Sequence, residues 1–199
     1  MRWLTLHLRS RRVPVALAAA AAGTAAMWLL QVAADDGPAG SVLVVMTVLL
    51  LVVVLTGTLG GPDETLERTA SLAWAPRRGL HLVAALAVVV GLLALTLPTG
   101  SALGPVGLVL RNAAGLLGVT ALCAPLLGAA RAWFVPLAWT IPAAFYPVTG
   151  PVLGEVLTWT GQPAGNGPAA VAAAVLGVAG LLTYAFAGPA LRPPAEAGL

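Results

Sequence analysis

Lysine is absent from this chain, and charge of either sign is scarce. Charged residues make up 9% of the 199 residues, and all ten basic residues are arginine. A soluble domain carries about 25% charged residues. Hydrophobic residues make up 59% of the chain. This composition excludes an ordinary soluble domain and indicates a membrane protein.

Three further absences limit the chemistry. A phosphate-binding P-loop needs a lysine, so this chain cannot form one and any ATP must be bound by another chain. Cys123 is the only cysteine, which excludes an intrachain disulfide and a cysteine-rich metal site. His7 and His81 are isolated, and no pair of carboxylates lies within an apolar segment. We therefore expect no enzyme activity, no metal, no cofactor in this chain and no nucleic-acid partner.

Apolar segments are what the chain has in abundance. A transmembrane helix needs about 20 predominantly apolar residues, and a lone strand in lipid leaves its backbone unpaired. The sequence therefore predicts an all-α polytopic membrane protein, a single transmembrane domain over 1–199 with about six transmembrane helices. The expected spans are 13–32, 42–59, 80–97, 106–127, 133–148 and 169–187.

The arginines predict the orientation. Nine of the ten precede the first span, follow the last, or lie in the second-to-third and fourth-to-fifth connections, and the other three connections have none. Under the positive-inside rule, both termini and the loop 60–79 are cytoplasmic, in a multi-pass protein of the cell membrane. The loop 149–168 is then outside.

The N-terminus allows a second interpretation. The basic start, the apolar run and "QVAADD" are also compatible with a signal peptide cleaved after Ala34. Against it, the apolar run is about 20 residues, longer than the usual 7 to 15 of a signal core.

Charge is concentrated in one stretch, "GGPDETLERTASLAWAPRRGLH". Pro62 suits a helix start, Asp63 and Glu64 complement the helix dipole, and Ala75 with Pro76 is expected to end the helix. A helix over Pro62–Trp74 would have one apolar and one charged side, formed by Leu66, Ala70, Ala73 and Trp74 and by Glu64, Glu67, Arg68 and Ser71. It is either a connector on the membrane surface or a docking helix for a cytoplasmic subunit.

The layout resembles the permease subunit of a bacterial ABC-2 type exporter. The resembling features are the basic segment "RWLTLHLRSRR", six spans, the acidic helix "PDETLERTA" in the first cytoplasmic loop, and a long outer loop before the last span. The resemblance implies that Asp63, Glu64, Leu66, Glu67, Arg68 and Trp74 form a coupling helix that docks on a separate ABC ATPase subunit. It also implies a second permease, identical or homologous, and a short helix or re-entrant element before the last span, for which "VLGEVLTW" is the candidate.

Two features within the spans are candidates for the translocation pathway. Arg111, next to Asn112, is the only charged residue inside a predicted span. It either forms an ion pair, for which Glu155 of the outer loop is the expected partner, or extends its side chain to the membrane surface. Pro136, Pro142 and Pro147 interrupt the fifth segment. This segment is either a broken helix at a binding site or gate, or a short re-entrant or tilted helix that closes the bundle.

The sequence therefore predicts a permease that couples ATP hydrolysis by a partner to export of a peptide, drug or lipid-like substrate. The alternative is a polytopic scaffold that binds a cytoplasmic partner without transport.

Overall fold

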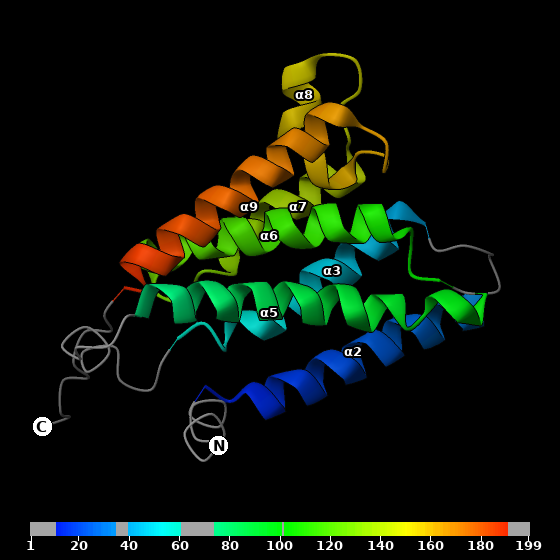
Figure 1. Ribbon diagram of the computed structural model, residues 1–199. Helices are drawn as coiled ribbons and strands as arrows, with labels where there is room; N and C mark the ends of the chain where they lie inside the picture. The colour runs from blue at the N-terminus through cyan, green and yellow to red at the C-terminus, as the bar shows by residue number, and fades with distance from the viewer. Residues whose placement is uncertain (1–10, 35–39, 61–73, 101, 191–199) are drawn as a thin grey trace, which may run out of the picture.

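A computed structural model describes residues 11–34, 40–60, 74–100 and 102–190. These residues form helices joined by turns, without a strand among them, so the all-α prediction is confirmed. The helices are α2 (Val13–Ala34), α3 (Ser41–Thr56), α5 (Trp74–Ala94), η1 (Leu97–Thr99), α6 (Val106–Leu127), α7 (Phe134–Phe145), α8 (Val152–Leu157), η2 (Trp159–Gly161) and α9 (Gly167–Ala187) (Figure 1).

Each predicted apolar segment contains a helix, but the helices differ in length. Four are long and apolar enough to span a membrane, namely α2, α5, α6 and α9. Helix α3 has 16 residues and α7 has 12. At 1.5 Å per residue these are about 24 Å and 18 Å long, shorter than a hydrocarbon core of about 30 Å.

The fifth segment is shorter than predicted because of its prolines. Pro136 lies in the first turn of α7, where a missing backbone N–H costs nothing. Pro142 removes a hydrogen bond further along, and the helix ends at Phe145, two residues before Pro147. The expected span 133–148 is therefore a 12-residue helix.

The third helix begins earlier than predicted. Ala75 and Pro76, which were expected to end a helix over Pro62–Trp74, belong instead to the first turn of α5, which starts at Trp74. A first-turn proline needs no hydrogen-bond acceptor, and this position also suits its fixed φ angle. Trp74 is thus the first residue of a long apolar helix, while residues 61–73, with most of the predicted coupling helix, lie outside the described residues.

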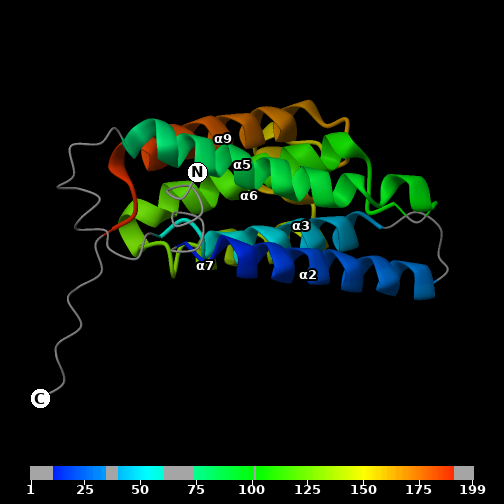
Figure 2. The ribbon, with the colours of Figure 1, turned by 60° about the horizontal axis from the view of Figure 1, so that its bottom comes forward.

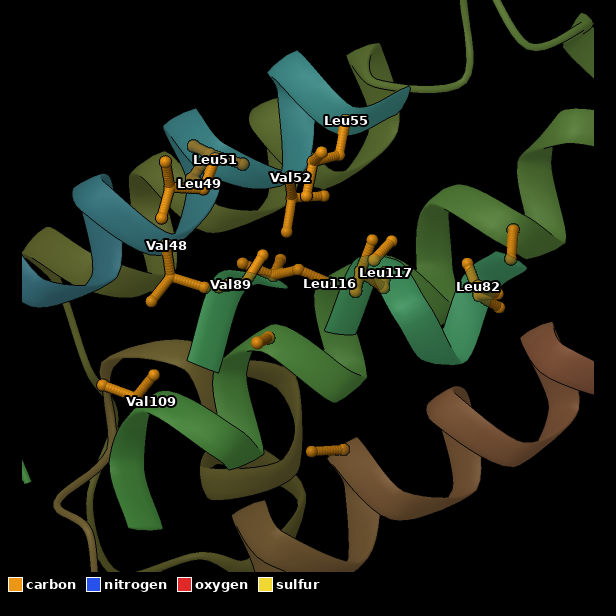
Figure 3. Packing of buried hydrophobic residues seen from close by; sticks show 14 of the residues in the cluster. Val48, Leu49, Leu51, Val52, Leu55, Leu82, Val89, Val109, Leu116 and Leu117 are labelled. Atoms are coloured by element: carbon orange, nitrogen blue, oxygen red, sulfur yellow. The ribbon is translucent and has the colours of Figure 1, made fainter. Parts of the chain in front are cut away.

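Helices α3 and α6 form the centre of the bundle. Figure 2 shows α2 beside α3 in one layer and α5 beside α9 in another, with α6 between them. Figure 3 shows Val48 and Val52 of α3 directed toward Val89 of α5 and Leu116 of α6, and all four are buried. Helices α2, α5 and α9 expose apolar side chains on their outer sides, as helices facing lipid do.

Polar contacts bring the same-side helix ends together. Arg11, just before α2, and Tyr184 of α9 both donate to the carbonyl of Leu59 after α3. Thr58 hydrogen-bonds His81 of α5 at 2.9 Å. We call this the arginine-rich end, because Arg77, Arg78 and Arg131 also lie in the segments that meet there.

Helices α6 and α9 run in parallel with their backbones in contact. A Cβ atom added at Gly118 would collide with the carbonyl of Leu176, and one added at Gly180 would collide with the carbonyl of Gly118. Gly177 likewise approaches the carbonyl of Ala114. Small residues on both helices allow this close approach.

Candidate functional site

Arg111 of α6 is the centre of the most extensive buried polar cluster around the candidate residues. Its side chain is 7% exposed. Its Nη1 donates to the carbonyl of Pro163 at 2.7 Å and its Nη2 donates to the carbonyl of Gln162 at 2.6 Å. Its Nε donates to Oδ1 of Asn112 at 3.3 Å. The guanidinium therefore holds the chain just before α9 against the start of α6.

Asn112 extends this contact to the preceding residues. It is fully buried, and its Nδ2 donates to the carbonyl of Thr160 at 3.2 Å. Two adjacent residues of α6 thus satisfy three backbone carbonyls within residues 160–163, which would otherwise be buried without donors in a membrane-embedded protein.

The predicted ion pair between Arg111 and Glu155 is not formed. Glu155 lies in the first turns of α8, and its Oε1 accepts from the backbone N–H of Gly150 at 3.3 Å. The segment before α9 folds back so that two carbonyls reach Arg111. Carbonyls satisfy the guanidinium without burying a carboxylate, whose desolvation is costly. The alternative, extension of Arg111 to the surface, is also not what the structure shows.

The segment between α7 and α9 is a folded cap with its own hydrogen bonds. Gln162 donates through Nε2 to the carbonyl of Val148 and to Oγ1 of Thr158, each at 2.8 Å. Trp139 of α7 donates to the carbonyl of Leu157 at 2.6 Å. We call residues 148–163 the cap. The short helix predicted over Val152–Trp159 is present within it, as α8 and η2.

The cap enters the bundle rather than lying on it. Trp159 is 1% exposed, and its ring fills the space beside Gly115 of α6, where a Cβ atom would collide with it. Gly161 approaches the carbonyl of Ala143 on α7 equally closely. Glycine at these two positions lets the cap and the helices pack without separation.

The cap leaves several buried polar atoms without a hydrogen-bond partner. Within the described part of the chain these include Oγ1 of Thr160, Oε1 of Gln162, Nε1 of Trp159 and, on α7, Oγ1 of Thr140. Each such atom costs about 1–3 kcal/mol of stability. The contact between the cap and the helices is therefore less stable than one in which every buried polar atom is hydrogen-bonded.

The other predicted pathway residues lie on α7, whereas Arg111 lies on α6. Pro136 is buried in the first turn of α7, whereas Pro142 is exposed near its end. The candidates that lie together are Arg111 and Asn112. Sequence reasoning missed Trp159, Thr160 and Gln162, because polar residues in "TWTGQP" are typical of an outer loop and carry no signal of burial.

Trp74 is the one predicted coupling-helix residue that the structure describes. The guanidinium of Arg77 lies 5.6 Å from the centre of its ring, within cation–π range. An aromatic and an arginine at the end of an apolar helix are typical of a membrane interface. Asp63, Glu64, Leu66, Glu67 and Arg68 lie outside the described residues.

Comparison with protein-family models, curated proteins and solved structures found no match for this chain. The fold and the buried cluster define a helical membrane protein, with four helices long enough to cross the bilayer.

Proposed function

We propose that this chain is the membrane-spanning permease subunit of an ATP-driven exporter, working with a separate ABC ATPase and a second permease copy or homologue. The observation that carries the proposal is the cap, a short helical element folded into one end of the bundle directly before the last helix and held there by Arg111. A cap that is bound to the bundle but leaves several buried polar atoms without a hydrogen bond suits an outer gate that opens during transport.

The proposed topology has six crossings with the arginine-rich end in the cytoplasm of a cell membrane. The start of α2 and the end of α9 lie at the same end of the bundle, which supports an even number of crossings (Figure 1). Helices α3 and α7 are short, and a bilayer accommodates short helices by thinning locally at modest cost.

Helix α5 provides the proposed mechanical link to the ATPase. It is continuous from Trp74 to Ala94, and it contacts both α6 and α9. The acidic stretch that begins at Asp63 precedes it directly, and we propose that this stretch docks on the ATPase. A movement imposed there would pass into α5 as a rigid helix and reach the two helices that hold the cap.

The route for cargo is proposed to lie between two permeases. The centre of this single bundle is filled by apolar side chains of α3, α5 and α6 (Figure 3). Apolar helix surfaces around such a route would suit an amphipathic or apolar cargo, such as a peptide, a drug or a lipid.

The decisive experiment reverses two predicted docking charges. A Glu64→Arg, Glu67→Arg double variant should insert normally but lose the co-purifying ATPase and the stimulated ATP turnover, since a charge in a hydrogen-bonded interface is worth about 2–5 kcal/mol. Glu155→Arg, at the cap, is the matched control and should keep the ATPase. Normal ATPase recovery with the double variant would refute the docking assignment.

A non-transporting scaffold is the second candidate, and the packed apolar centre of the bundle favours it. The two candidates differ in what co-purifies from detergent. An ATPase with a Walker motif, stimulated by this chain, supports the exporter, while a partner without nucleotide binding supports the scaffold.

The topology is tested by labelling single cysteines on intact cells in a Cys123→Ala background. An impermeant thiol reagent should label cysteines placed at Gly37 and Gly165 but not one at Ser71. Labelling at Ser71 would reverse the orientation, and a mature N-terminus at Asp35 would establish signal cleavage.

A further inference from the structure

Helices α6 and α9 run in the same direction, so the chain between them must return across the bundle. Ala114 of α6 lies beside Gly177 of α9, and Gly118 lies beside Gly180. Both helices are long enough to span a membrane, and both start at the end opposite the arginine-rich end, which we call the far end. Only α7 and the cap are available to make the return.

Helix α7 ends well before the far end. It starts beside the end of α6, because the N–H groups of Arg131 and Ala132 donate to the carbonyl of Gly128 and close the turn between the two helices. From there its 12 residues cover about 18 Å. Leu127 and Gly115 are also 12 residues apart along α6. Helix α7 therefore stops near the level of Gly115.

The cap continues from this level to the far end. Trp159 lies against Gly115, which is nine residues, or about 14 Å, from the start of α6. Closer to that start, Arg111 binds the carbonyls of Gln162 and Pro163. In Figure 1, α8 lies beside the start of α9, while α2 and α5 extend farther along the bundle. The cap therefore lies alongside the far half of α6 rather than beyond the helix ends.

Side chains satisfy the irregular backbone of the cap, as is required of backbone at membrane depth. Trp139 of α7 donates to the carbonyl of Leu157, and Oγ1 of Thr158 accepts from the N–H of Val148. These bonds add to those that α6 makes to the cap. A loop in water would not need them, because water pairs with exposed backbone groups.

The short helix α8 has an apolar outward face. Leu153 and Leu157 are each more than half exposed, and because they are four residues apart they share one face of the helix. Glu155, the only charged residue of the cap, lies midway between them in sequence and so on the opposite side. Helix α8 packs against α9, whose Val175 is also exposed. The apolar face of α8 thus adjoins a helix that faces lipid.

We propose that the cap lies inside the bilayer, in the leaflet at the far end, and that acyl chains contact Leu153 and Leu157. Helix α7 and the cap then form one composite crossing, which requires less thinning of the bilayer than α7 alone. The carboxylate of Glu155 faces the headgroups, as in a helix that lies in the membrane interface. The proposal requires membrane insertion but neither an ATPase nor transport, so it can fail or hold independently of the proposed function.

Spin labels test what surrounds α8. Single cysteines replace Leu153 and Leu157 in a Cys123→Ala background, carry a nitroxide, and are studied in phosphatidylcholine vesicles. Oxygen dissolves in hydrocarbon, whereas chromium oxalate is a charged ion that stays in water. The ratio of oxygen to chromium oxalate collisions should be roughly tenfold higher at both positions than at Gly165, an exposed residue after the cap. A label at Val175 is the lipid-facing reference.

Each result of this experiment decides the proposal. Frequent oxygen collisions with chromium oxalate excluded support contact with acyl chains. Chromium oxalate collisions as frequent as at Gly165 would overturn the proposal, because α8 would then lie in water. Protection from both probes would also overturn it, because a second copy or another protein would then cover α8.

A charge substitution tests the same contact without a label. Leu153→Asp places a short carboxylate on the lipid-facing side of α8, and the ratio of folded to unfolded protein in vesicles should fall roughly tenfold. Gly165→Asp is the matched control and should change nothing, since nothing lies within 4 Å of that position. Equal ratios in the two variants would refute the lipid contact.

Discussion

The contact between α6 and α9 and the contact between α2 and α5 are opposites in one small bundle. Along α6 and α9, glycines bring the backbones together, and Arg111 fixes the chain that enters α9. Between α2 and α5, by contrast, a groove of about 340 Å³ remains, lined in part by Thr24, Trp28 and Thr99. The hydrogen bond from Trp28 to Thr99 there is exposed.

The difference shows what holds helices together in lipid. Moving the apolar side chains of α2 from lipid into contact with protein releases little free energy, because lipid tails are equally apolar. Close backbone packing and buried hydrogen bonds supply the attraction instead, and both are concentrated at α6 and α9. We therefore expect the contact between α6 and α9 to be the rigid part of the bundle and α2 to be the helix that separates first.

The largest expected effect is on the glycine contact. Gly180→Val forces a side chain into the backbone of α6 and should lower stability by about 3 kcal/mol or more, measured by thermal unfolding in detergent. Gly91→Val is the control, because nothing lies within 4 Å of that position. Equal stability of the two variants would show that α6 and α9 are not in backbone contact.

The next largest loss of stability is expected from substituting Arg111, and a much smaller one from substituting Glu155. Arg111→Leu leaves the carbonyls of Gln162 and Pro163 buried without donors, which should cost about 2–3 kcal/mol and speed amide exchange over residues 159–162. Glu155→Gln should change stability by less than about 0.5 kcal/mol. A large effect of Glu155→Gln, reversed by exchanging the two charges, would restore the ion pair.

The smallest loss of stability is expected at the looser contact, between α2 and α5. Trp28→Phe removes the exposed hydrogen bond to Thr99 and should cost no more than about 1 kcal/mol. Trp133→Phe is a matched control, since its indole donates to Ala130 within its own turn. A much larger loss in Trp28→Phe would mean that α2 is fixed as firmly as α9.

Much of the helix layout could be predicted from local pattern. The fourth helix has the predicted bounds, Val106–Leu127, because Pro105 precedes it and Gly128, with a positive φ, follows it. The start of α5 was predicted wrongly, because a proline after an alanine is as compatible with a first helical turn as with a helix end. The length of α7 depended on how Pro142 and Pro147 combine, which composition alone does not reveal.

The candidate site could likewise be predicted only in part. Arg111 and Asn112 could be singled out, because a charge inside an apolar segment is rare in any fold. Their partners could not, because a backbone carbonyl has no sequence signature and any residue supplies one. The cap was expected only as a short helix, and its burial depends on Gly115 and Gly161, which accommodate atoms far away along the chain.

Long apolar runs and a lysine-free, charge-poor composition were enough to predict a helical membrane protein, because a lone strand in lipid leaves its backbone unpaired. The positions of the arginines also predicted which end of the bundle is rich in arginine. The tertiary structure alone decided that α6 and α9 touch, that the cap enters the bundle and that Arg111 binds carbonyls. These outcomes depend on which backbones approach each other in space, and that is set by the packing of the whole bundle.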